Sequence, residues 1–172
     1  RMTRPEDFTV GKNLATTPGA VVFRNRLLEV IHYAPTTDKV HAMPIVIVTP
    51  WINKFYILDL NPKKSLVKYL TDQGFAVFIT SWKNPTPEMR DVTFEDYIVE
   101  GVNEAIEAAR GFCGVEQVHA VGYCIGGTLL SIAAAALSDW GDNRIQDISL
   151  FAAQADFSEP GELSLYISPA QI

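Results

Sequence analysis

Cysteine and histidine are scarce in this chain of 172 residues, which contains two cysteines, Cys113 and Cys124, and three histidines. Two cysteines form neither a disulfide framework nor a zinc site, which needs about four clustered Cys/His ligands, so we expect no metal. A predicted strand of about six residues separates the two cysteines by roughly 20 Å, whereas a disulfide joins Cα atoms at most about 7 Å apart. We therefore expect both thiols to be free and Cys113 to be structural.

Basic patches and long apolar runs are also missing. The 14 Lys and Arg residues are outnumbered by 20 Asp and Glu, for a net charge of −6, and they form no cluster. Nucleic-acid binding is therefore not expected, because phosphates are held by grouped basic side chains. No apolar run approaches the roughly 18 to 20 residues of a membrane span, and the first five residues lack the apolar core of a signal peptide. We expect no transmembrane segment and a cytoplasmic location.

The composition is that of a soluble globular protein, with 48% apolar and 20% charged residues. After about 20 polar residues, 20–23 and 27–33 predict a β-hairpin. Residues 45–48 form a short run that is apolar on both faces, as in a central strand of a parallel sheet. Further along, the pattern predicts three strands, over 75–80, 117–122 and 148–153. It also predicts three helices: one that ends at Gly74, one that begins at Thr93 and one over 128–137.

This alternation predicts an α/β fold, a mainly parallel sheet with right-handed crossovers and helices on both faces. We divide the chain into residues 1–42, an N-terminal segment and hairpin leading into the core, and residues 43–172, the core itself. The acidic residues of the helix after Thr93 are interpreted as a solvated face.

One segment carries strong chemical information: Gly122-Tyr123-Cys124-Ile125-Gly126-Gly127, between a predicted strand and a predicted helix. Glycines two positions before and after a nucleophile are typical of a nucleophile elbow, where the chain reverses so tightly that a Cβ would collide with its neighbours. The helix N-terminus carries a partial positive charge that favours a thiolate there. Cys124 is therefore predicted to be a catalytic nucleophile, and the alternative is a small buried hydrophobe.

Acyl transfer also needs N–H donors for the oxyanion of the tetrahedral intermediate. The residue after the nucleophile, Ile125, supplies one. The other is expected from the loop after the first central strand, where Pro50 has no N–H and Trp51 or Ile52 remains.

A base for Cys124 is not apparent, because no histidine follows it in the sequence. In this architecture the order is nucleophile, acid, histidine. His119 lies five residues earlier, about 16 Å along an extended strand, and is interpreted as a core or face residue. His32 and His41 are assigned to packing or the surface, and Asp156 is a weak candidate for the acid. The chain is thus predicted to hold half of an active site.

These motifs resemble polyhydroxyalkanoate synthases, the PhaC-type polymerases, almost from end to end. The similar blocks are 8–15, 19–23, Pro50–Leu60, Ser81–Pro85, the lipase-like box Gly122–Thr128 and Asp156–Leu163. Trp51 is more similar to the class I synthases, which act without a partner subunit on short-chain substrates.

The resemblance implies an α/β-hydrolase fold and a Cys-His-Asp site that polymerises 3-hydroxyacyl-CoA with release of CoA, and 3-hydroxybutyryl-CoA is the expected monomer. It implies Cys124 as the acyl carrier and the backbone of Ile52 and Ile125 as oxyanion donors. The substrate-pocket candidates are Trp51, Asn53 and Tyr123. The family's Asp and His follow its lid, so we expect the lid and the C-terminal part to be absent here.

The resemblance further implies no cofactor beyond the CoA of the substrate, and as partners the growing polyester chain, a second copy in a homodimer and the polyester granule surface. We expect these 172 residues alone to be inactive. Two alternatives stay open: a cysteine hydrolase of the same fold, similar to dienelactone hydrolases, and a non-catalytic, granule-associated module.

Overall fold

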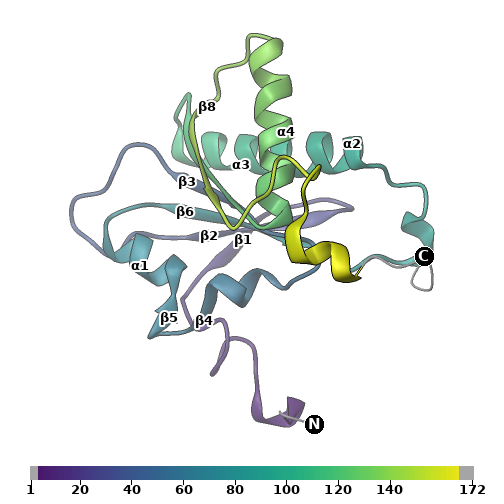
Figure 1. Cartoon of the computed structure of the whole chain (residues 1–172). Helices are drawn as coiled ribbons and strands as arrows, with labels where there is room; N and C mark the ends of the chain where they lie inside the picture. The colour runs from purple at the N-terminus through teal and green to yellow at the C-terminus, as the bar shows by residue number, and fades with distance from the viewer. Residues whose placement is uncertain (1–3, 167–172) are drawn as a thin grey trace.

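A six-stranded sheet forms the centre of the computed structural model, which describes residues 4–166 (Figure 1). The strand order is β1-β2-β6-β3-β7-β8. Strands β6, β3, β7 and β8 run parallel, whereas β2 is antiparallel to β6 and β1 is antiparallel to β2. The strands of this sheet are β1 (Ala20–Arg24), β2 (Leu28–Tyr33), β3 (Ile45–Val48), β6 (Val77–Trp82), β7 (Val118–Tyr123) and β8 (Ile145–Phe151). The short strands β4 (Asp59–Asn61) and β5 (Lys64–Ser65) pair separately.

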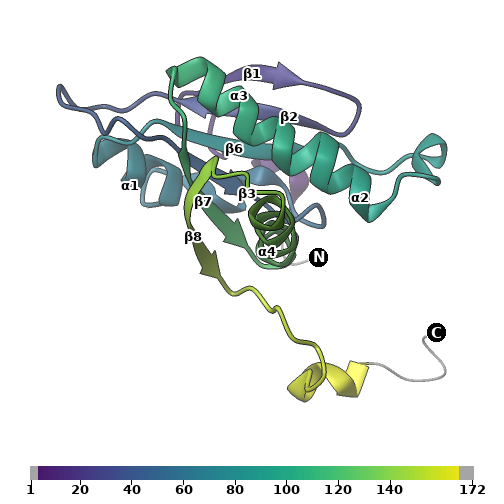
Figure 2. The same ribbon diagram turned by 90° about the horizontal axis from the view of Figure 1, so that it is seen from above.

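Helices lie on both faces of this sheet. The first face is covered by α2 (Phe94–Asp96), a π-helical segment (Tyr97–Asn103), α3 (Glu104–Cys113) and α4 (Ile125–Asp139), and the second by α1 (Leu66–Asp72) (Figures 1 and 2). Successive residues of the strands point to opposite faces of the sheet and belong to two hydrophobic cores. Val46 and Phe78 pack with α3 and α4, whereas Ile47 and Ile79 pack with α1. Among residues 4–166, 3-10 helices lie between these elements at Phe55–Leu58 and Pro87–Met89, before β1 at Pro5–Asp7 and after β8 at Gly161–Tyr166.

The predicted hairpin and the parallel strands are confirmed, with shifted boundaries. The strand expected over 75–80 is β6, two residues later, and the strand expected over 148–153 is β8, which begins at Ile145. Helix α4 begins at Ile125, three residues before the predicted start, because Gly126 and Gly127 belong to its first turn. The helix predicted after Thr93 begins there with a capping box to Asp96, but it widens into the π-helical segment.

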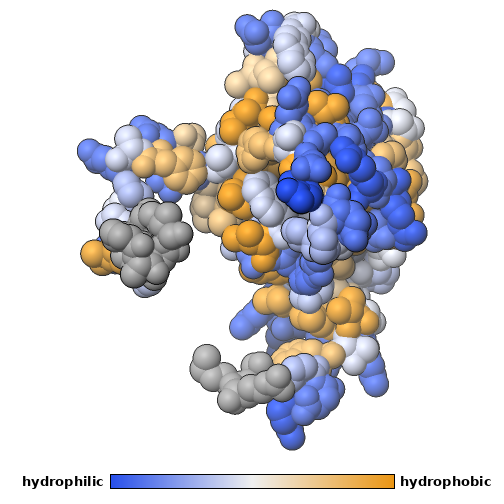
Figure 3. Space-filling view, turned by 90° about the vertical axis from the view of Figure 1, so that its right-hand side faces the viewer, coloured by the Kyte–Doolittle hydropathy of each residue, from blue (hydrophilic) through white to orange (hydrophobic). Residues whose placement is uncertain are grey.

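The expectation of cover on both faces is met for the middle of the sheet but not for β8. Most residues of β8 are exposed, including Ile148, Leu150 and Phe151. The chain after β8 leads away from the sheet, and Figures 2 and 3 show it standing off the body with hydrophobic residues at its surface. No helix among residues 4–166 is both long and apolar enough to cross a bilayer. Within the same range, His, Cys, Asp and Glu side chains form no group suited to a metal ion.

The hairpin belongs to the same sheet as the core, because β2 pairs with β6 along its whole length. Its tip is fixed to the first face by Arg26, whose guanidinium contacts Asp96 at 3.1 Å and Glu100 at 2.5 Å. The division at residue 42 stays a prediction, and its outer limits, residues 1–3 and 167–172, lie outside the described residues.

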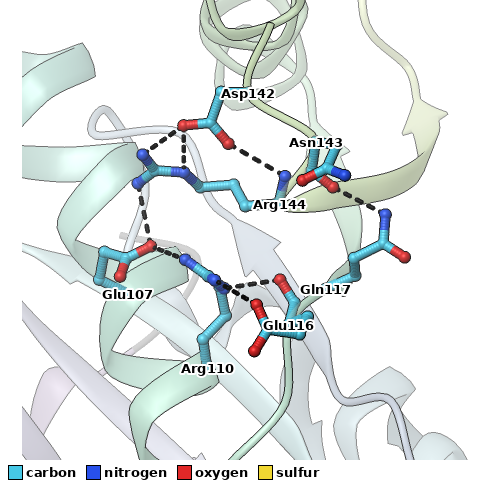
Figure 4. A network of polar contacts seen from close by, with 7 residues as sticks. All are labelled: Glu107, Arg110, Glu116, Gln117, Asp142, Asn143 and Arg144. Carbon is cyan, nitrogen blue, oxygen red and sulfur yellow. Dashed lines mark hydrogen bonds and ion pairs between the residues drawn. The ribbon is translucent and has the colours of Figure 1, made fainter.

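A network of charged side chains joins the ends of α3, β7 and β8 at the edge opposite the elbow (Figure 4). Glu107 accepts hydrogen bonds from Arg110 at 2.5 Å and from Arg144 at 3.0 Å. Arg144 also donates to Asp142 through Nε at 2.8 Å. The hydrogen bond from Arg144 lowers the pKa of the Asp142 carboxyl and raises that of the guanidinium. Arg110 Nε also donates to the Glu116 carbonyl at 2.7 Å, so the network ties the loops before β7 and β8 to α3.

Candidate active site

Cys124 lies at the turn between β7 and α4, in the position predicted for a nucleophile. Its backbone has φ 54° and ψ −130°, a conformation that costs a non-glycine residue roughly 1 to 3 kcal/mol. Hydrogen bonds hold it there: the Cys124 N–H donates to the Phe151 carbonyl at 2.9 Å, and the Cys124 carbonyl accepts from Gly127 N–H at 2.9 Å. The strained backbone is therefore fixed by both β8 and the first turn of α4.

The three glycines of the elbow are each required by close packing. A Cβ at Gly122 would lie 2.3 Å from the Gly127 Cα, and a Cβ at Gly127 would lie 2.5 Å from the Ala153 Cβ. At Gly126 it would lie 2.5 Å from the Val48 carbonyl oxygen and 2.6 Å from the Thr49 carbonyl carbon. The glycine pattern is thus explained by the contact of α4 with the ends of β7 and β3.

The Cys124 side chain is half-buried at the N-terminus of the 15-residue helix α4. As the first residue of that helix, Ile125 has an N–H without an acceptor in the preceding turn, so this donor is free for an oxyanion. The parallel strands β3, β6 and β7 all end at this edge of the sheet. The geometry combines a thiol, a helix N-terminus and a free N–H at one place, as acyl transfer requires.

The loop after β3 lies beside the elbow, as expected for an oxyanion loop, since Gly126 packs on Val48 and Thr49. Ile52 is 68% exposed, and Asn53 is also exposed. Trp51 is half-buried in an aromatic cluster, with ring centroids 6.4 Å from Trp82, 6.0 Å from Phe94 and 5.2 Å from Tyr97. Trp51 thus has a packing role here.

Tyr123, the third pocket candidate, is the last residue of β7 and is half-buried next to Cys124. It pairs with Phe151 in the sheet. The roles of Ile52, Trp51, Asn53 and Tyr123 toward a substrate stay predictions.

None of the three histidines lies beside Cys124. His32 packs against Phe78 and Phe112, and burial lowers its pKa. His41 stacks on Phe75 at 3.9 Å. His119 is near the start of β7, with Cys124 just past its other end, about 16 Å away along the strand.

His119 nevertheless has a carboxylate partner that the sequence did not predict. Its Nδ1 is 2.8 Å from Asp147 Oδ2 of β8, in an open groove of about 310 Å³ on the α1 face. This histidine–carboxylate pair lies too far from Cys124 to activate it. Sheet register brought the two residues together, and register could not be deduced from either segment alone.

Asp156, the weak candidate for the acid, is exposed after β8. Hydrogen bonds from Ser158 lower the pKa of its carboxyl. The Asp156 carboxylate accepts a hydrogen bond from the backbone N–H of Ser158, two residues later, which is the geometry of a turn. The two cysteines are both free, as predicted, and burial raises the pKa of Cys113 in α3.

Comparison with known proteins gives two family matches. Residues 1–70 match the family of the poly-beta-hydroxybutyrate polymerase (PhaC) N-terminus, and residues 44–170 match the alpha/beta hydrolase fold. The chain is 47% identical over 172 residues to a poly(3-hydroxyalkanoate) polymerase of Methylorubrum extorquens, covering 100% of this chain and 28% of that protein. It is 42% identical over 165 residues to the PhaC subunit of the polymerase of Cupriavidus necator, covering 96% of this chain and 28% of that subunit.

Solved structures agree on the fold. An alpha/beta hydrolase enzyme from the metagenome of lagoon sediments at Mar Chica, Morocco, superposes with a TM-score of 0.56 at 14% identity, over 88% of this chain and 60% of that one. A fungal esterase from Rhizomucor miehei superposes with a TM-score of 0.55 at 19% identity, over 82% of this chain and 46% of the esterase chain. The chain spans about 28% of the length of the polymerases it matches. It belongs to the α/β-hydrolase fold family, and within that family it is confirmed to resemble the poly(3-hydroxyalkanoate) polymerases along its full length.

Proposed function

We propose that the protein containing this chain is an acyltransferase that polymerises 3-hydroxyacyl-CoA into polyhydroxyalkanoate and releases CoA, with 3-hydroxybutyryl-CoA as the expected monomer. The observation that carries the proposal is Cys124 at the strained tip of a glycine-flanked elbow. The polymerase names of relatives at 47% and 42% identity support the substrate class.

In the first step the Cys124 thiolate attacks the carbonyl carbon of the acyl-CoA thioester. The carbon–sulfur bond to CoA breaks, and the CoA sulfur leaves with the electron pair and takes up a proton. The N–H groups of Ile125 and Ile52 donate to the oxyanion between these events. One thioester replaces another at near-equal free energy, so the acyl group stays activated.

In the second step the hydroxyl oxygen of another hydroxyacyl group attacks the Cys124 thioester. A new ester bond forms, the bond to the Cys124 sulfur breaks, and the proton of the hydroxyl passes to the base and then to the thiolate. Water must be excluded, since hydrolysis would end the chain as an acid. Asn53 of the loop after β3, Tyr123 beside Cys124 and Trp51 of the aromatic cluster are proposed to contact the substrate.

The base and its acid partner are not supplied by the histidines of this chain, which are occupied elsewhere in the fold. We propose that a His and an Asp from another part of the protein complete the site. The 172 residues alone are then inactive as a polymerase. In the cell we place the protein in the cytoplasm at the polyester granule surface, as a homodimer.

Product analysis tests this proposal. The complete protein, incubated with 3-hydroxybutyryl-CoA, is expected to release free CoA and to form insoluble polyester, measured by thiol titration and by methanolysis of the pellet. The 172-residue chain under the same conditions is expected to release no CoA.

Two other outcomes identify other functions. Free CoA with soluble 3-hydroxybutyrate and no polymer indicates a cysteine hydrolase of the same fold. No CoA release by the complete protein indicates a non-catalytic module. Either outcome rejects the proposal.

A further inference from the structure

Thr49 lies one residue beyond the hydrogen-bonded part of β3. The pairing of β3 ends at Ile47 with β6 and at Val48 with β7. Thr49 is nevertheless fully buried, at 0% exposure. Its backbone N–H and carbonyl therefore need partners other than the sheet, because a buried polar group without one costs about 1 to 3 kcal/mol.

Two side chains of β6 supply these partners. The Thr49 N–H donates to Thr80 Oγ1 at 2.9 Å, and the Thr49 carbonyl accepts from the indole Nε1 of Trp82 at 2.7 Å. The Thr49 hydroxyl donates in turn to the Thr80 carbonyl at 2.7 Å. We call these three residues, Thr49, Thr80 and Trp82, the strand-end clamp.

The strand-end clamp is itself held rigidly. Thr80 is 0% exposed and Trp82 is 9% exposed. The indole packs directly on the π-helical segment, since a Cβ at Gly101 would lie 2.5 Å from its Cη2. Trp51 packs edge-on against the same indole. Both hydrogen-bonding side chains are therefore confined by the fold around them.

The strand-end clamp fixes the backbone that faces the elbow. A Cβ on Gly126 would lie 2.7 Å from the Thr49 carbonyl oxygen, the atom that Trp82 binds. Pro50, which follows, has a restricted φ, so the course of the chain into Trp51 and Ile52 depends on the orientation of Thr49. The distance between the loop after β3 and Cys124 is therefore set at Thr49.

We propose that the strand-end clamp positions the backbone N–H groups of the loop after β3 toward the acyl carbon held on Cys124. Thr80 and Trp82 are positioning residues, which act through Thr49 and do not touch the substrate. This inference rests on the proposed function of Cys124. Since a displacement of about 1 Å can cost a hundredfold in rate, loss of one hydrogen bond in the strand-end clamp has a large expected effect.

Thr80→Val in the complete protein tests the proposal, because it removes the hydroxyl and nearly keeps the shape. Two rates are measured at Cys124: its acylation by 3-hydroxybutyryl-CoA in a single turnover, and its alkylation by iodoacetamide, followed by peptide mass spectrometry. Alkylation displaces iodide at a saturated carbon and builds no oxyanion, so it does not need the loop. We expect acylation to fall about tenfold to hundredfold, alkylation to change less than about twofold, and Thr80→Ser to restore acylation to within about threefold of the parent.

Thr71→Val is the matched control. Thr71 is 1% exposed, and its hydroxyl donates to the Lys68 carbonyl at 2.9 Å within α1, on the other face of the sheet. The Thr71→Val variant loses a buried hydroxyl, as Thr80→Val does, and is expected to keep the acylation rate of the parent protein. Trp82→Phe, which keeps an aromatic ring but lacks the N–H, decides the question if Thr80→Val fails to fold, with acylation expected to fall about tenfold.

Equal acylation by Thr80→Val and Thr71→Val overturns the positioning role. A parallel fall of acylation and alkylation also overturns it, since the substitution then acts on the elbow itself. If the parent protein itself is not acylated at Cys124, the proposed function is wrong and this inference falls with it. If the parent is acylated but Thr80→Val and Thr71→Val behave alike, only the positioning role is wrong.

Discussion

Cys124→Ala in the complete protein is expected to abolish polyester formation, with CoA release falling at least about 10⁴-fold. The substitution removes the sulfur that would hold the acyl group, and loss of a catalytic nucleophile typically costs this much or more. The elbow backbone tolerates the change, because alanine faces the same φ of 54° as cysteine. CoA release measured with a thiol reagent, beside a thermal unfolding curve, separates loss of chemistry from loss of fold.

Cys124→Ser is the informative companion. Serine is close to cysteine in shape, but an alkoxide is harder to generate and an oxyester is a poorer acyl donor, so we expect at least a hundredfold fall in rate. Retention of more than about a tenth of the parent activity by Cys124→Ala, with normal folding, would assign the acyl transfer to another residue.

Gly126→Ala is expected to destabilise the protein by about 3 kcal/mol or more and to remove activity. The new Cβ would lie 2.5 Å from the Val48 carbonyl oxygen and 2.6 Å from the Thr49 carbonyl carbon. Both are backbone atoms of a buried strand end, which cannot turn away as a flexible side chain can, so α4 must shift against β3. Urea unfolding of the variant and the parent measures the difference.

Gly111→Ala is the matched control for this prediction. Gly111 lies in α3, and a Cβ there would meet no atom within 4 Å. Alanine in an open helical position is expected to stabilise by about 0.5 to 1 kcal/mol. Equal stability of the two variants would show that α4 does not pack on β3 as described.

The parts of this fold that the sequence predicts well are those that local pattern determines. Ile45–Val48 is apolar at every position, and all four residues are buried between two helical layers. The glycine spacing around Cys124 predicts the elbow because each glycine marks a contact too close for a side chain. Gly74 marks the end of α1 because its φ of +90° is a backbone conformation that residues with a side chain rarely adopt.

The parts that the sequence does not predict depend on long-range register. The His119–Asp147 pair joins residues 28 positions apart on neighbouring strands. The bonds from Thr80 and Trp82 to Thr49 span 31 and 33 positions, and nothing in the pattern of either segment marks them. The π-helical turn at Tyr97–Asn103 has no local signal either, since its apolar residues recur at ordinary helical spacing.

Mass spectrometry of the complete protein after brief exposure to 3-hydroxybutyryl-CoA tests the central claim most directly. The claim predicts a 3-hydroxybutyryl adduct, or a short oligomer of it, on the peptide that contains Cys124, removable by hydroxylamine as a thioester is and absent from Cys124→Ala. An adduct on Cys113 or on any other residue, or release of CoA with no adduct on Cys124, would contradict it.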